Sequence, residues 1–331
     1  MILAPKTQVM LGALIGLCFL SGCASTFAKR KVSHTEVILA QPKLEIVEAE
    51  LLGVRIKPFE PGEISKEVDE SRGISKEIRK AEGYYSAVQL RSAMQQSGYW
   101  GPVRVVSTAV TGGEVIVTGR ILESDGEIFK LEISVHDATG LLWFDKEYEE
   151  VVDAKVYDQT ENNTEPFQYL YNRIANDLAE HRVKIAPKEV ESIRRVAELK
   201  FAEEFAPDAF KGYIVNGTPK QESNSFWSRS SAPAETSPIL KVARLPADDD
   251  AMLKRIRRIR VREEALIDTL DLQYERLSRE MSAEYTQWRS ARLNEMNAVR
   301  ELEKKRNKKI GTAVAVTVLG ALVGADRKSV V

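Results

Sequence analysis

Apolar and polar residues alternate most regularly over residues 115–148. Three runs with a period of two are separated by the glycine-containing turns at 124–126 and 138–140. This pattern is typical of antiparallel strands joined as hairpins, so we predict a three-stranded meander. On its last strand, Leu142, Phe144 and Tyr148 are expected to point inward. His136 falls on the polar side of the middle strand and is expected to be a solvated sheet residue.

The segments on either side of the meander predict further strands and helices. Val54 and Ile56 alternate with polar residues as in a half-buried strand, and a second strand follows at 103–106. Apolar residues recur at helical spacing over 75–96, 166–180 and 187–206. We therefore predict an α+β domain over 44–213, with a small mixed sheet, an antiparallel meander and packed helices.

A second unit follows the α+β domain. Residues 247–310 contain neither glycine nor proline, and they predict one long helix, solitary or in a coiled coil. Its apolar stripe repeats every 11 residues, a period that keeps the stripe nearly straight. The most regular row consists of Leu266, Leu277, Trp288, Val299 and Ile310. Because a lone helix cannot bury this row, we expect a partner. It is a second copy held through Leu266, Leu277 and Trp288, another protein, or the first domain.

Charged residues crowd the start of this helix. The three aspartates at 248–250 suit a helix cap and the positive end of the helix dipole, and a carboxylate site for a metal is the alternative. Six basic residues follow within 254–262. One interpretation is a solvated face paired with Glu263 and Glu264. The other is a site for anionic lipid, lipopolysaccharide or peptidoglycan, with Arg255, Arg258 and Arg262 as the contacts.

Three segments lack a globular pattern. Residues 214–246 are rich in proline and serine and predict a flexible linker, in which Phe226-Trp227 is either a docking point or part of a folded-back loop. Residues 311–325 are apolar, short for a membrane span, and carry Gly320 and Gly324 at a spacing that lets helices approach closely. Residues 326–331 resemble a translated sequencing adapter. We expect the natural chain to continue past about Ala325, with a genuine short tail as the alternative.

The amino terminus has the parts of an export signal. Lys6 supplies a short basic region, and the apolar core over 9–20 is too short to cross a bilayer. The core ends in Leu20-Ser21-Gly22-Cys23, which resembles the lipobox of bacterial lipoproteins. This resemblance implies a signal peptide over 1–22 that is cleaved after Gly22, acyl chains on Cys23, and a lipidated tether over 23–43. Ala24 after the cysteine implies anchoring in the inner leaflet of the outer membrane, facing the periplasm.

A second resemblance concerns the α+β domain. The order of elements over about 51–180 resembles the amino-terminal α/β domain of TolB and of curli-secretion lipoproteins. It implies a role as an accessory subunit of an export or adhesion-fibre apparatus.

Composition narrows the classes of function. The net charge is −1, whereas a nucleic-acid-binding domain normally carries a basic excess, so we expect no nucleic-acid partner. The three histidines lie far apart, so we expect no metal site and no cofactor. The sequence holds none of the common motifs for nucleophilic, metal or phosphate chemistry. We therefore expect a non-catalytic envelope lipoprotein that is anchored through Cys23 and acts in scaffolding or assembly. The alternative is an enzyme or ligand-binding lipoprotein that acts on the cell wall.

Overall fold

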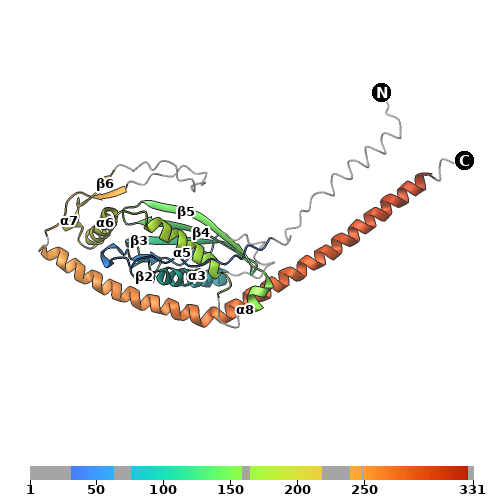
Figure 1. Ribbon diagram of the computed structural model, residues 1–331, viewed down its shortest axis with the longest axis horizontal. Helices are drawn as coiled ribbons and strands as arrows, with labels where there is room; N and C mark the ends of the chain where they lie inside the picture. The colour runs from blue at the N-terminus through green and yellow to red at the C-terminus, as the bar shows by residue number, and fades with distance from the viewer. Residues whose placement is uncertain (1–30, 63–75, 159–164, 218–238, 248, 327–331) are drawn as a thin grey trace, which may run out of the picture. The chain divides into compact units, whose positions relative to one another are not determined.

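The computed structural model describes residues 31–62, 76–158, 165–217, 239–247 and 249–326, with side chains of the last helix given as far as residue 307 (Figure 1). The described residues belong to two units. The larger unit spans Val32–Arg292, and the other contains the last helix from Leu293 onward. Cys23 with its signal, the Phe226-Trp227 pair, Asp248 and residues 327–331 lie outside the described residues.

A five-stranded mixed sheet forms the centre of the larger unit. Its order is β2-β1-β3-β4-β5, and β1 is parallel to both β2 and β3. The last three strands are an antiparallel meander, as the alternation predicts. The strands are β1 (Val54–Ile56), β2 (Val103–Val105), β3 (Val115–Ser124), β4 (Ile128–Asp137) and β5 (Leu142–Val151). The predicted α+β class, with a mixed sheet, packed helices and a long terminal helix, is confirmed.

Helices α3 (Lys76–Ser97) and α5 (Gln168–Arg182) pack against each other, with α3 next to β2 and α5 next to β5. Their buried stripes, which include Leu90 of α3 and Ile174 of α5, meet the apolar side of the meander. Gly83 lets α3 approach the chain after β1, because a Cβ atom there would lie 2.1 Å from the carbonyl oxygen of Phe59. The remaining short elements are η2 (Glu48–Glu50), α4 (Ala154–Asp158), α6 (Pro187–Phe205) and α7 (Pro207–Phe210).

The inward residues at the start of β5 differ from the prediction. The pairing of β4 with β5 shifts between Val135 and His136, so that Val135 faces Phe144 while His136 faces Leu142. The extra residue is Trp143, which is buried and donates its indole N–H to Asp137 at 3.0 Å, whereas Leu142 is exposed. The expectation that Leu142 points inward is therefore wrong, because a bulge reverses the alternation there. His136 is half-buried rather than solvated, and burial lowers its pKa.

The described end of the predicted tether is bound to the domain. The Ser33 N–H donates to the carbonyl of Val151 at 3.0 Å, and the Ser33 hydroxyl accepts from the Val151 N–H at 2.9 Å. On α5, the amide of Asn176 accepts from the N–H of Ala40 at 2.7 Å and donates to the carbonyl of Ile38 at 2.9 Å. The expectation of a tether over 23–43 does not hold for 33–40, which is hydrogen-bonded to β5 and α5.

The described ends of the predicted linker are strands. β6 (Ile214–Gly217) and β7 (Ile239–Val242) form a two-stranded antiparallel sheet. Ile214 and Val242 pack against an apolar cluster that includes Leu199 and Phe201 of α6. The expectation of a flexible linker over 214–246 is therefore wrong at both described ends, while residues 218–238 lie outside the described part.

The last helix, α8 (Ala251–Asp326), starts where the aspartates predict. The Asp250 carboxylate accepts the N–H of Leu253 at 2.8 Å and so caps the helix. The helix continues through Gly311 and includes the small-residue segment 311–325. Its 76 residues correspond to a length of about 110 Å. Within the described part of the chain, no helix has a stretch long and apolar enough to span a membrane.

Candidate functional site

The first half of α8 packs on its own domain through one face, which we call the docked face. Its buried residues are three, four, seven or eleven positions apart, spacings that keep them on one side of a helix. They are Leu253, Ile256, Ile267, Asp271, Ser278, Tyr285, Arg289 and Arg292. Leu266 and Leu277 are 60% and 44% exposed, so the 11-residue row is not the face that docks. The expected partners were a second copy, another protein or the first domain. The first domain is a partner of α8, through the docked face.

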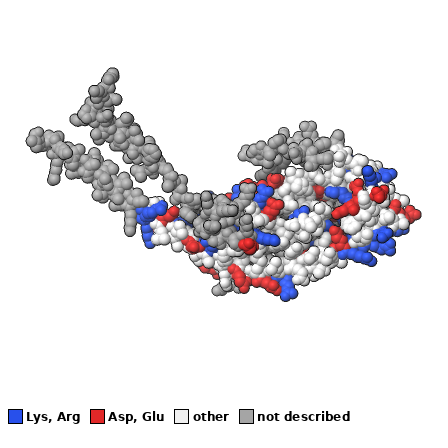
Figure 2. All heavy atoms as spheres, turned by 180° about the vertical axis from the view of Figure 1, so that it is seen from behind, with Lys and Arg blue, Asp and Glu red and all other residues white. Residues whose placement is uncertain are grey.

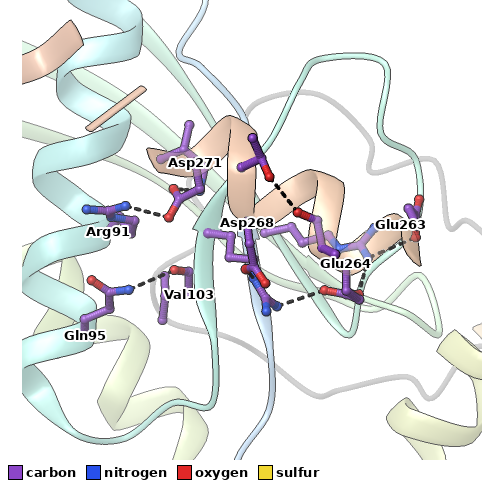
Figure 3. A network of polar contacts seen from close by, with 12 residues as sticks. Arg91, Gln95, Val103, Glu263, Glu264, Asp268 and Asp271 are labelled. Atoms are coloured by element: carbon purple, nitrogen blue, oxygen red, sulfur yellow. Dashed lines mark hydrogen bonds and ion pairs between the residues drawn. The ribbon is translucent and has the colours of Figure 1, made fainter. Parts of the chain in front are cut away.

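Two arginines of the domain's sheet meet carboxylates of α8, among them the labelled Glu263, Glu264 and Asp268 (Figure 3). The Arg55 guanidinium on β1 contacts Glu264 at 2.6 Å and Glu263 at 3.5 Å. Arg104 on β2 contacts Glu264 at 2.8 Å and also pairs with Asp268. Arg55 lies on the polar side of the predicted strand, and it is buried because α8 covers it.

The same helix covers the β2 edge of the sheet (Figure 3). Asp271 accepts the backbone N–H of Val105 at 2.8 Å and the guanidinium of Arg91 at 2.6 Å. Glu275, one turn further along, accepts from Arg91 at 3.0 Å. Among the described strands, β1 is the only neighbour of β2, so a carboxylate of α8 takes the place that another strand would fill.

A second contact lies deeper, between α3, the segment before α5 and the end of the docked face. The guanidinium of Arg289 donates to both oxygens of Glu165, at 2.7 and 2.9 Å, and the Tyr85 hydroxyl donates to the same carboxylate at 2.6 Å. Burial opposes ionisation of Glu165, but the charge and hydrogen bonds of Arg289 outweigh it and lower the pKa of Glu165. Such a bidentate pair fixes the orientation of the guanidinium relative to the carboxylate as well as the distance between them.

Glu82 of α3 completes this buried polar cluster, which comprises Glu82, Tyr85, Glu165, Tyr285 and Arg289. Glu82 is fully buried and accepts from Arg79 at 3.0 Å and from the hydroxyls of Ser124 and Tyr285. The rings of Tyr85 and Tyr285 meet edge to face, with centroids 5.0 Å apart. Trp288 is half-buried and stacks on Tyr285 at 5.9 Å. The cluster's carboxylates are thus engaged in structural contacts.

The side of α8 opposite the docked face is basic near its start (Figure 2). Arg255, Arg258 and Arg262 are exposed, and among the described residues no carboxylate pairs with them. Of the six basic residues over 254–262, Arg260 forms the expected pair, with Glu264 at 4.0 Å. The other five form no such pair among the described residues, because Arg55 and Arg104 of the domain hold Glu263 and Glu264.

An open cavity of about 400 Å³ lies between β5 and α5, beside the bound segment that contains Val37. Asp177 accepts from the ammonium of Lys146 at 2.5 Å and from the hydroxyl of Tyr148 at 2.7 Å. Burial and the charge of Asp177 raise the pKa of Tyr148, which favours the protonated phenol that donates to Asp177. In the described residues no group of histidine, cysteine and acidic side chains is arranged to hold a metal ion.

Comparison with known proteins identifies no family for this chain: no family model matches it, and no curated protein matches it.

Proposed function

We propose that the protein is a cell-envelope lipoprotein, anchored by acyl chains on Cys23, with a non-catalytic role in scaffolding or assembly. The observation that carries the scaffold role is α8. Its first half is fixed to the domain by buried ion pairs, and the same helix continues from Leu293 to Asp326. A helix longer than the part that packs on its own domain offers surface to a partner.

The bound segment 33–40 bears on the anchor. If Cys23 is lipidated, about ten residues separate the lipid from Ser33, which is fixed to β5. They reach about 35 Å at most when fully extended. The domain would therefore work next to the membrane surface rather than far from it.

We further propose that copies of the chain associate through Leu266, Leu277 and Trp288. The exposed Leu266 and Leu277 lie on the unoccupied part of α8, and an apolar row on a helix surface is the usual seam of a coiled coil.

The second candidate is a ligand-binding lipoprotein, which the cavity between β5 and α5 favours. Its charged lining of Lys146, Arg173 and Asp177 suits a polar ligand. An accessory role in an export or adhesion-fibre apparatus stays a proposal that rests on the resemblance in element order.

Two experiments test the proposal. Labelling with radioactive palmitate is expected for the wild type and to be lost in Cys23→Ser, while Cys18→Ser is the matched control because it changes a cysteine in the discarded signal. Label retained in Cys23→Ser would contradict the anchor.

Capture of the intact protein from detergent-solubilised envelopes is expected to recover a discrete set of partners. Turnover of purified muropeptides by the isolated protein would instead show an enzyme.

A further inference from the structure

Over residues 254–275, three acidic residues of α8 face the domain and three arginines face away from it, while Arg257 and Arg260 lie toward α6, next to Glu198 and Phe201. The acidic residues Glu264, Asp268 and Asp271 face the domain, where Arg55, Arg91 and Arg104 neutralise them. The basic residues Arg255, Arg258 and Arg262 are left on the outside. On an isolated helix these acidic residues would partly offset the positive charge of the nearby arginines. Here the acidic residues pair with arginines of the domain, so the positive charge of Arg255, Arg258 and Arg262 is not offset by them.

The geometry of the outer basic face is that of a flat contact. Arg255, Arg258 and Arg262 are spaced three and four residues apart, so they lie in one line on the side away from Leu253 and Ile256. The line lies on a convex helix rather than in a pocket, so its three guanidinium groups do not converge on one small anion. Its natural counterpart is an extended array of negative charges.

Apolar side chains flank these arginines. Val261 is 69% exposed and Leu266 is 60% exposed, on either side of the arginine line. Exposed apolar residues beside arginines on one helix face are typical of a helix that lies in the headgroup region of a membrane. A soluble polyanion would gain nothing from these apolar side chains.

We infer that the outer face of α8, centred on Arg255, Arg258 and Arg262, is a docking surface for an anionic phospholipid bilayer. The inference rests on the proposed membrane location, because the acyl anchor would supply the high local concentration that a weak electrostatic contact needs. The contact sets how the domain lies on the bilayer: α8 faces the lipid, and the meander faces away from it.

The test uses the chain from Ala24 onward, without lipid, so that its outcome does not depend on acylation of Cys23. This chain keeps every described residue. Binding is measured by co-sedimentation with vesicles of equal parts phosphatidylglycerol and phosphatidylcholine, and with vesicles of phosphatidylcholine alone. Binding only to the anionic vesicles, and weaker binding as the salt concentration rises, are expected.

The structure offers a matched pair of variants. R255Q/R258Q removes two exposed arginines three residues apart, neither paired with a described carboxylate. R276Q/R279Q removes two arginines with the same spacing on the same helix, but these pair with Glu280 at 2.8 Å and Glu275 at 2.9 Å. With each basic residue near an anionic surface contributing roughly fivefold, R255Q/R258Q is expected to lower partitioning about 25-fold and R255Q/R258Q/R262Q about 100-fold. R276Q/R279Q is expected to change it less than about threefold.

Equal losses in the two double variants, or equal binding to uncharged vesicles, would overturn the inference. Inorganic polyphosphate serves as the soluble probe. If it binds more tightly than the anionic vesicles, and R255Q/R258Q abolishes that binding, the partner is a soluble polyanion and the membrane assignment is wrong. Failure of the palmitate experiment with success here would leave the lipid-docking surface standing without the anchor.

Discussion

Replacing Arg289 by methionine tests whether the buried polar cluster holds α8 on the domain. Methionine keeps an unbranched side chain in a site that contacts the rings of Tyr285 and Phe167, at 4.2 and 5.3 Å from the guanidinium. It removes the charge that neutralises Glu165. The substitution therefore isolates the ion pair from the packing more cleanly than alanine does.

The expected loss follows from burial on both sides. The side chains of Arg289 and Glu165 are 1% and 4% exposed, so removing one partner leaves a charge in a dry site. Such losses are about 3–5 kcal/mol, and we expect about 3 because the Tyr85 hydroxyl and the Phe167 N–H still donate to Glu165. In R289M/E165M both charges are gone and the Tyr85 hydroxyl is left without its acceptor. We expect a loss of about 1–2 kcal/mol, less than the sum of the single losses.

The two single variants differ in how their stability depends on pH. In the wild type, the pKa of Glu165 is lowered from its ordinary value of 4.5, so the pair stabilises fully above that value and is lost as the pH falls through the lower folded pKa. In R289M, Glu165 is buried without a counter-charge and its pKa rises. Protonation then relieves the strain, so the deficit at about pH 7 is expected to shrink at about pH 5. In E165Q the unpaired Arg289 stays charged at both values, and its deficit should not change.

Urea unfolding followed by circular dichroism gives these free energies, and hydrogen exchange over residues 251–292 shows whether α8 is the part that loosens. A loss below about 1 kcal/mol in R289M would show that the ion pair does not hold the helix. A deficit in R289M that is the same at both pH values, as is expected for E165Q, would refute the assignment of the charge effect to Glu165.

Three further predictions follow from the helix and the anchor. Asp271→Ala removes the acceptor of the Val105 amide and of Arg91 and is expected to cost about 2–4 kcal/mol in urea unfolding, whereas Asp268→Ala, with a half-exposed side chain, should cost less than about 1 kcal/mol. L266A/L277A should change the free energy of unfolding by less than about 1 kcal/mol but raise the dissociation constant of self-association in sedimentation, and unchanged sedimentation would contradict the proposed seam. Palmitate label should disappear in Cys23→Ser and persist in Cys18→Ser.

Much of the fold was predictable because its strands and helices bury one regular face each. The meander follows from alternation between glycine turns, and α3 from the helical spacing of Ala87, Leu90 and Met94. The failures occur where structure rests on something other than a regular apolar face. Leu142 and Trp143 exchange roles because of a single extra residue. Residues 33–40 are held by side-chain amides of α5, which leave no period in the bound segment.

The docked face of α8 was missed for a related reason. A scan for apolar residues selects Leu266 and Leu277, but the face that docks is chosen by charge and hydroxyl partners on the domain. Asp271, Ser278, Tyr285 and Arg292 recur every seven residues, a repeat that a search for apolar rows passes over. Their partners Glu82 and Glu165 are even harder to recognise in the sequence. They are two carboxylates among many, and only their burial in the folded protein distinguishes them from the others.

An interface held by buried ion pairs specifies its register more strictly than an apolar seam does. Sliding α8 by one turn would separate Arg289 from Glu165 and Asp271 from the Val105 amide. Each separation leaves a buried charge or amide unpaired, which costs more than the correct pair contributes. The main effect of the buried polar groups is therefore to destabilise every other register of α8 on the domain. With the register fixed, the outward residues are fixed too, and Arg255, Arg258, Arg262, Leu266 and Leu277 belong to the surface of this half of the helix that remains for other molecules to bind.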